Sequence, residues 1–310
     1  MKAVRFHAHG DSEVLAYEEA PKPVAAAAEV VVKVAATSFN PVDVAIRAGY
    51  LQQVFPVSFP HVPGIDVAGT IAEVGAEVTG WAVGDAVVAF LPMNTDGAGA
   101  EYVAVAADLL ASAPRNVELT DTAALPAVGL TAWQALFEYA GLVAGNSVLI
   151  NGAGGAVGGY AVQLAARAGA AVTATASTRS TDRVRADGAD RIVDYTAIPL
   201  AQAVSGQRFD VVVNLVATSP EETAALVDLV ADRGIFVSTT TPGEPDPERG
   251  VRAERVFARS DATQLAGLVA LVDAGDLRID VADRRPLSEM ATVHAEAVTG
   301  QLPGKTILLP

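Results

Sequence analysis

The stretch SVLINGAGGAVGGYAVQLAARAGA, residues 147–170, decides the fold. It begins with a short apolar run, 148–150, of the kind that forms a buried strand, and a cluster of glycines follows at once. Beyond the glycines, apolar residues recur at helical spacing and predict one stripe of an amphipathic helix, made by Val157, Tyr160, Ala161, Leu164, Ala165 and Ala168. Gly169 ends this helix, and AVTATA (171–176) predicts a second strand.

The order strand, glycine turn, helix, strand favours a bound anion. Such a unit places a helix N-terminus, with its unpaired N–H groups, at the carboxyl end of a parallel sheet. The strict pattern G-x-G-x-x-G fails because Val157 occupies its last place, and the chain instead has G-x-x-G-x-x-G through Gly152, Gly155 and Gly158. Close helix–strand packing also favours glycine, but the flanking strand and helix favour a dinucleotide phosphate site.

The end of the second strand indicates which dinucleotide binds. Enzymes that use NAD usually carry an acidic residue about 20 residues beyond the first glycine, where it binds the ribose hydroxyls. Here Ser177, Thr178 and Arg179 follow the strand, and no acidic residue occurs between Gly158 and Asp182. A guanidinium suits a 2′-phosphate, which a carboxylate would repel. We therefore expect NADPH as the cofactor; the alternative for Arg179 is a solvated surface side chain.

Composition narrows the class of protein. The 310 residues are enough for two domains, and the 51% hydrophobic content supports large cores. With 36 acidic and 21 basic residues the net charge is −15, which disfavours nucleic acid and anionic membranes as partners. There is no cysteine, and the four histidines have no metal-binding spacing. Since no signal peptide or membrane-spanning run is evident, we expect a cytoplasmic protein.

The pattern of expected strands and helices changes near residue 120. Before it, strand-like runs at 30–36, 67–74 and 84–90 are separated by Pro and Gly. After it, a helical pattern at 125–139 precedes alternating strands and helices, with strands at 191–195, 210–217 and 234–241 and a helix at 221–231. Asp261 and Gln264 predict the start of another helix that Gly275 ends. The fold class is therefore α/β, a Rossmann-type doubly wound parallel sheet together with a β-rich domain.

Six stretches distributed over the whole chain resemble one family. They are NPVDVAIRAG (40–49), VPGIDVAGTIAEVG (62–75), AALPAVGLTAWQAL (123–136), VLINGAGGAVGGYAVQLA (148–165), GADRIVDYT (188–196) and GKTILLP (304–310). Together they resemble the zinc-free, NADP-dependent quinone oxidoreductases related to zeta-crystallin, in the medium-chain dehydrogenase/reductase superfamily. This resemblance implies a chaperonin-10-like β-rich domain from 1–119 and 280–310, a nucleotide-binding domain at 120–279, and a substrate cleft between the two. It also implies a homodimer, for which VRAERVF (251–257) is the candidate edge strand.

This chain differs from the zinc-containing members of the superfamily at positions where they carry Cys, His and Glu. Those enzymes carry a Cys within the stretch aligned with 37–43 and a His-Glu pair where this chain has Ile65 and Asp66. A catalytic zinc needs three Cys, His or carboxylate ligands, so we expect no metal site. Hydride transfer from NADPH to an acceptor that is already electrophilic, a quinone or an α,β-unsaturated carbonyl, is then the simplest chemistry.

The resemblance also supplies candidate site residues. Asn40 and Tyr50 are the catalytic candidates near the acceptor; the alternatives are a turn residue before Pro41 and an ordinary core tyrosine. A loop cap is the preferred role for Asp43. Thr131 matches a position near the nicotinamide, or packs within a helix, and Tyr195 matches a tyrosine beside the 2′-phosphate, or packs in a strand. The full set of expected cofactor contacts is Thr131, Gly152, Gly154, Gly155, Ala156, Val157, Gly158, Ser177, Arg179, Tyr195, Thr239, Thr240 and Thr241.

Two other functions fit the same sequence. One is an enoyl reductase that acts on a carrier-bound acyl chain, although the acidic composition argues against docking of an acidic carrier. The other is a non-catalytic NADPH sensor, whose nucleotide site would look the same. Turnover of NADPH with a small electrophile distinguishes both from a quinone or enone reductase.

Overall fold

The computed structural model describes residues 1–310, and the chain forms two compact units. The first consists of Met1–Ala127 and Arg259–Pro310, and the second is Val128–Ala258. The domain boundaries expected from sequence, 119/120 and 279/280, need correction. The helix that begins after Asp261 lies in the first unit, since periodicity shows an apolar face without showing which core it packs against.

The second unit is built on six parallel strands. They are β8 (Ser147–Asn151), β9 (Ala171–Ala176), β10 (Arg191–Asp194), β11 (Phe209–Asn214), β12 (Val230–Ser238) and β13 (Arg252–Arg255). Their order in the sheet is β10-β9-β8-β11-β12-β13, so the chain moves outward from β8 in one direction and then returns to its other side. This is the doubly wound order expected from the sequence, and it reverses between β8 and β11.

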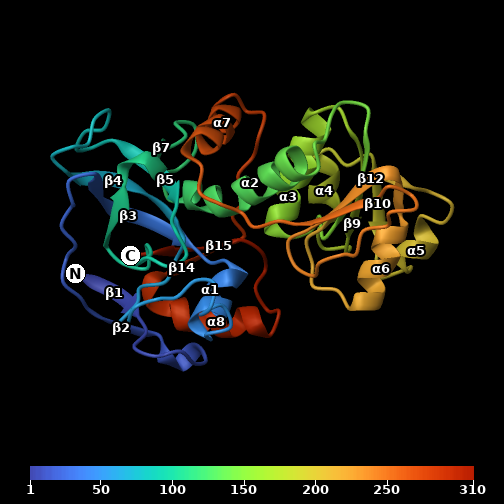
Figure 1. Ribbon diagram of the computed structural model, residues 1–310. Helices are drawn as coiled ribbons and strands as arrows, with labels where there is room; N and C mark the ends of the chain where they lie inside the picture. Colours follow the sequence, from blue (N-terminus) through green and yellow to red (C-terminus); the bar gives the residue numbers. More distant parts are fainter. The chain divides into compact units, whose positions relative to one another are not determined.

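Helices cover both faces of this sheet (Figure 1). They are α2 (Pro126–Trp133), which continues as a π-helix (Gln134–Tyr139), then α3 (Ala156–Arg167), α4 (Thr181–Ala186), α5 (Leu200–Ala203) and α6 (Pro220–Asp228). α3 and α4 lie on one face, whereas α5 and α6 enclose a core with Leu149, Val212 and Phe236 on the other. Strands buried on both faces explain the nearly continuous apolar runs in the sequence.

The first unit is β-rich. A seven-stranded sheet has the order β14-β15-β3-β4-β5-β7, with β6 also paired to β3, and β1 pairs with β2 separately. The strands are β1 (Lys2–Arg5), β2 (Ala16–Glu19), β3 (Glu29–Ser38), β4 (Asp66–Val74), β5 (Ala86–Phe90), β6 (Tyr102–Ala106), β7 (Ala111–Ser112), β14 (Asp283–Pro286) and β15 (Thr306–Leu309). Because β15 pairs with β3, both ends of the chain build this unit.

Three α-helices and four short 3₁₀ helices complete the first unit. They are α1 (Pro41–Arg47), α7 (Ala262–Asp273) and α8 (Met290–Val298), with 3₁₀ turns at Ser12–Val14, Ala107–Leu109, Asp121–Ala124 and Leu287–Glu289. The Asp261 carboxylate accepts from the Gln264 N–H and so caps α7, as the sequence predicts. None of the helices combines the length and the apolar character that crossing a membrane requires.

Element ends differ from the sequence expectations by a few residues. The strand expected at 210–217 ends at Asn214, and the helix expected to reach 231 ends at Asp228. α6 begins at Pro220 because Ser219 and Glu222 form a capping box there. Val230 already belongs to β12, so the chain turns back into the sheet sooner than its apolar pattern suggests.

Candidate functional site

The glycine loop of the second unit lies at the carboxyl end of β8 and leads directly into α3. Gly152 has a positive φ of 95°, a conformation that favours glycine. At Gly158 an added Cβ would overlap the Gly152 carbonyl oxygen and lie 2.5 Å from Ala153 Cα. Gly158 therefore allows α3 to pack against the loop. This is the close helix–strand packing that was the alternative to a phosphate site.

The N-terminus of α3 is the part of the loop that can receive an anion. Gly155 is its N-cap, is exposed and offers no side-chain cap. Ala156 and Val157 in the first turn are partly exposed, and first-turn N–H groups have no partner within a helix. The open amides of Ala156 and Val157 therefore meet the positive end of the helix dipole, which suits a pyrophosphate.

Behind the loop, a chain of hydrogen bonds crosses the carboxyl ends of the parallel strands. The Gly152 N–H donates to Thr175 Oγ1 at 2.8 Å, and that hydroxyl donates to Asn151 Oδ1 at 3.0 Å. Asn151 Nδ2 donates to Asn214 Oδ1 at 2.9 Å, and Asn214 Nδ2 reaches Ser238 Oγ at 3.4 Å. Every bond runs in the same donor direction, so the chain is cooperative.

This polar chain was not predicted from the sequence, although a signal was present. Asn151, Asn214 and Ser238 each end an apolar strand, in SVLIN, DVVVN and GIFVS. A polar residue that closes a buried strand in an α/β sheet marks the edge where ligands bind.

The side chains expected near a 2′-phosphate lie where β9 and β10 end. Arg179 is exposed after β9 and makes no hydrogen bond or ion pair within the protein. The main-chain carbonyl of Ser177 accepts the Thr181 hydroxyl at 3.0 Å, whereas the Ser177 hydroxyl itself makes no hydrogen bond within the protein. Tyr195 directly follows β10 and is 55% exposed, and its contact with the 2′-phosphate stays a prediction.

The remaining expected cofactor contacts follow β12 or lie in α2. Thr239 N–H donates to the Asn214 carbonyl at 3.1 Å, and the Thr240 and Thr241 hydroxyls donate to the Val216 and Thr218 carbonyls. These bonds tie the segment after β12 to the segment after β11. Thr131 is partly buried in α2. The structure therefore gathers the glycine loop and the 239–241 segment at one sheet edge.

A separate polar cluster is buried in the first unit. Asp66 Oδ2 accepts from the Ser38 hydroxyl, from Asn40 Nδ2 at 2.8 Å and from Lys305 Nζ at 3.4 Å. Asp66 Oδ1 accepts from the Ala127 N–H at 2.7 Å. This places a buried ion pair between β4 and the segment before β15, with all its charged atoms hydrogen-bonded.

Asn40 is committed to this cluster. Its Nδ2 also donates to the Ser38 carbonyl at 3.3 Å, and its Oδ1 accepts from Lys305 Nζ at 2.8 Å. Asn40 is 5% exposed, and its Nδ2 has two acceptors within the protein. Asn40 is the N-cap of α1 and holds the loop that precedes it, and its contact with an acceptor stays a prediction.

Tyr50 lies apart from this cluster. It follows α1, is 83% exposed and does not line the pocket described below. The alternative of a core tyrosine is therefore wrong, and its contact with an acceptor stays a prediction.

Asp43 caps α1, the role that the sequence favoured. It is also a buried titratable group, which the sequence did not show. Its Oδ2 accepts from the Asn40 N–H at 2.8 Å and completes a capping box at α1. Burial, with the nearby Asp66 carboxylate, raises the pKa of Asp43 to about 7, although the Asn40 and Gly64 N–H groups and Lys305 act the other way. Burial also lowers the pKa of Lys305, against the attraction of both carboxylates.

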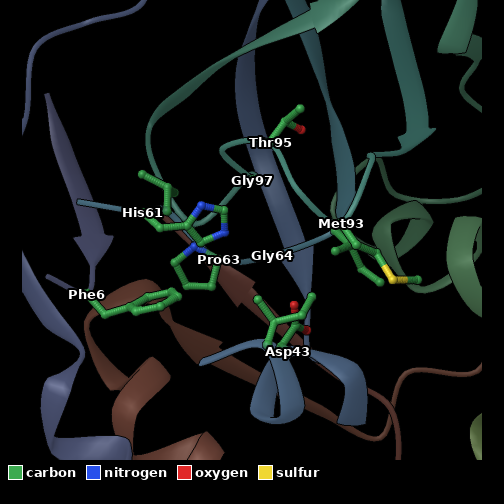
Figure 2. Close-up of a pocket in the computed structure, with 11 residues that line it drawn as sticks. Phe6, Asp43, His61, Pro63, Gly64, Met93, Thr95 and Gly97 are labelled. Atoms are coloured by element: carbon green, nitrogen blue, oxygen red, sulfur yellow. The ribbon is translucent and has the colours of Figure 1, made fainter. Parts of the chain in front are cut away.

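Asp43 faces a small pocket in the first unit (Figure 2). The pocket is lined by Phe6, Asp43, Ile46, His61, Val62, Pro63, Gly64, Ile65, Met93, Thr95 and Gly97. Its volume of about 10 Å³ leaves room for about one water molecule, so in this structure it does not hold a quinone ring. The His61 and Phe6 rings pack edge to face with 5.2 Å between their centroids, and burial lowers the pKa of His61.

Comparison with known proteins places the chain in a family. Residues 26–115 match the alcohol dehydrogenase GroES-like domain, and residues 188–308 match the zinc-binding dehydrogenase domain. Over 328 aligned residues, which span 100% of this chain and 98% of the relative, the chain is 33% identical to a chloroplast envelope quinone oxidoreductase homolog from Arabidopsis thaliana. The chain belongs to the quinone oxidoreductase family.

Solved structures agree with this family. A quinone oxidoreductase from Coxiella burnetii is 29% identical with a TM-score of 0.88, over 100% of this chain and 99% of that one. The Escherichia coli quinone oxidoreductase, solved in complex with NADPH, is 25% identical with a TM-score of 0.88 over 100% of both chains. The expected fold class, the medium-chain superfamily and an oxidoreductase activity are thereby confirmed.

The residues present do not fit the zinc ion named in one of these domain descriptions. The chain has no cysteine, and no three His, Asp or Glu side chains come together as metal ligands. Asp66 is held by three hydrogen-bond donors and by the Lys305 ammonium, whose positive charge disfavours a cation beside it.

Proposed function

We propose that this quinone oxidoreductase family member transfers a hydride from NADPH to a quinone or to the β-carbon of an α,β-unsaturated carbonyl. The observation that carries the proposal is the open N-terminus of α3 at the switch point of the sheet, together with Arg179, which follows the neighbouring strand β9 and has no partner within the protein. Support also comes from the Escherichia coli relative, which was solved with NADPH.

Each part of NADPH has protein groups to hold it. The pyrophosphate suits the amides of Ala156 and Val157, because they are unpaired donors in the first turn of the helix. The 2′-phosphate suits Arg179 through a charge-assisted hydrogen bond, with the Ser177 and Tyr195 hydroxyls as further donors. NADPH, when bound, supplies the hydride, and the protein supplies binding and orientation.

The reaction also consumes a proton. NADPH, a proton and a quinone give NADP⁺ and a hydroquinone; with an enone, the hydride adds to the β-carbon and the proton to the α-carbon. The Asn40, Asp66 and Lys305 cluster fixes the segment between β3 and α1. We assign it the role of keeping the acceptor side rigid, which lowers the cost of orienting the acceptor.

A homodimer is part of the proposal. β13 is an edge strand of the parallel sheet, and the side chains of Arg252 and Glu254 are exposed. In an antiparallel pair of two β13 strands with Ala253 on the two-fold axis, Arg252 of each copy lies opposite Glu254 of the other. Light scattering on wild type, Glu254→Arg and the charge-swapped double variant with Arg252→Glu tests this. Loss of the dimer in the single variant and its return in the double variant are expected; a wild-type monomer contradicts it.

The activity is tested by product analysis with NADPH deuterated at C4. With an enone, we expect one deuterium on the β-carbon of the product; with a quinone, we expect stoichiometric hydroquinone without semiquinone. A cytoplasmic location stays a prediction. If NADPH binds but neither acceptor is reduced, the protein is an NADPH sensor or acts on a carrier-bound acyl chain.

A further inference from the structure

Arg183 is connected to the glycine loop across helix α3. Arg183 belongs to α4, and its Nη2 donates to the carbonyl oxygen of Gly154 at 2.5 Å. The two residues are 29 positions apart in the chain, on elements that follow successive strands.

The accepting peptide group is held from both sides. The carbonyl of the Gly154–Gly155 peptide receives Arg183, while its N–H donates to the Gly152 carbonyl at 3.0 Å. In a trans peptide these two groups point in opposite directions, so the two bonds together fix the rotation of the peptide plane. Gly154 and Gly155 lack side chains and would otherwise rotate freely. The peptide directly precedes the open amides of α3.

Gly159 explains how the guanidinium reaches the loop. It lies within α3, one residue beyond the glycine pattern that the dinucleotide needs. An added Cβ at Gly159 would lie 2.9 Å from Arg183 Nη1 and 3.7 Å from Asp187 Oδ2. The helix therefore has a gap at Gly159 through which Arg183 passes.

We propose that Arg183 is a positioning residue for NADPH. It holds the Gly154–Gly155 peptide so that the first-turn amides of α3 face the pyrophosphate, and Gly159 provides the space that it needs. This inference rests on the NADPH site of the proposed function. It differs from the role of Arg179, because the pyrophosphate is common to NADPH and NADH, whereas the 2′-phosphate belongs to NADPH alone.

The test is a fluorescence titration of the full-length protein with NADPH and with NADH. Arg183→Ala should weaken both by the same factor, about ten-fold, since it removes a charged hydrogen bond that orders the loop. Arg183→Lys should recover part of the loss, and added guanidinium ion should partly rescue Arg183→Ala. Gly159→Ala should weaken both dinucleotides similarly while leaving Tm unchanged or raised, because alanine favours the helix.

Gly267→Ala is the matched control, since Gly267 lies in α7 and an added Cβ would contact nothing within 4 Å. It should leave both affinities unchanged. Binding by Arg183→Ala or Gly159→Ala within two-fold of wild type would overturn the proposal. A loss confined to NADPH would also overturn it, because Arg183 would then contact the 2′-phosphate. If the wild type binds neither dinucleotide, the proposed function itself fails.

Discussion

Asn151 Nδ2 donates to Asn214 Oδ1 at 2.9 Å, at the point where the strand order of the parallel sheet reverses. The two residues end β8 and β11 and face each other in register. The bond therefore joins the two halves of the nucleotide-binding sheet at the edge where its ligand is expected.

Replacing both asparagines should cost less than the sum of the two single replacements. Asn214→Leu removes the acceptor of the partly buried Asn151 Nδ2, so we expect the free energy of unfolding to fall by about 1–3 kcal/mol. The double variant with Asn151→Leu removes both polar groups and should lose less than the sum of the single variants. Urea unfolding measures this, and strictly additive losses would show that the bond does not couple the strands.

Arg179 should distinguish NADPH from NADH. Arg179→Ala removes the guanidinium expected at the 2′-phosphate, so NADPH affinity should fall about ten-fold or more while NADH affinity changes little. Titration with both dinucleotides checks this. Arg185→Ala is a matched control, since Arg185 pairs with Asp182 at 3.1 Å on the exposed side of α4. Equal losses for NADPH and NADH in Arg179→Ala would exclude the assignment.

Gly158 should tolerate no side chain. Gly158→Ala drives a methyl group into the Gly152 carbonyl and Ala153, and backbone cannot yield as a flexible side chain does. We expect a loss of about 1–3 kcal/mol in unfolding free energy and no measurable NADPH binding. Gly267→Ala, in another helix, should instead gain about 0.5–1 kcal/mol. Thermal unfolding compares the two, and equal stability of both variants would contradict this packing.

Asp43 should make the fold less stable as the pH rises. Its pKa of about 7 exceeds the ordinary value of 3.8, so between pH 4 and 7 the folded state holds a proton that the unfolded state has lost. The stability contributed by the protonated Asp43 is present below pH 4 and is lost as the pH rises to 7, by up to about 4 kcal/mol. Asp43→Asn keeps an oxygen for the cap and should remove this slope.

His294 makes the fold more stable as the pH rises, over a pH range that overlaps that of Asp43. Burial, with the nearby Arg47 guanidinium, lowers its pKa to about 3, so stability is lost as the pH falls below its ordinary value of 6.5. Denaturant unfolding from pH 4 to 8 should therefore show a steeper rise of stability with pH in Asp43→Asn than in wild type. Parallel curves for the two proteins would mean that Asp43 does not titrate in this range.

Local sequence patterns predicted β8, α3 and β9 because a strand, a glycine turn and a helical stripe each leave a short-range signal. The cluster of Asn40, Asp66 and Lys305 was not predicted, since Lys305 is 239 residues from Asp66 and no short-range pattern joins them. For the same reason, the sequence assigned α7 to the wrong unit, because the spacing of its apolar residues does not show which core they pack against.

The central claim, metal-independent hydride transfer from NADPH, is tested most directly by NADPH oxidation after exhaustive dialysis against a chelator. A small quinone and a medium-chain enal serve as acceptors, with NADH in parallel. We predict turnover of at least one acceptor at the rate of the undialysed protein, with NADPH preferred. Loss of turnover on chelation and its return with zinc would contradict the account.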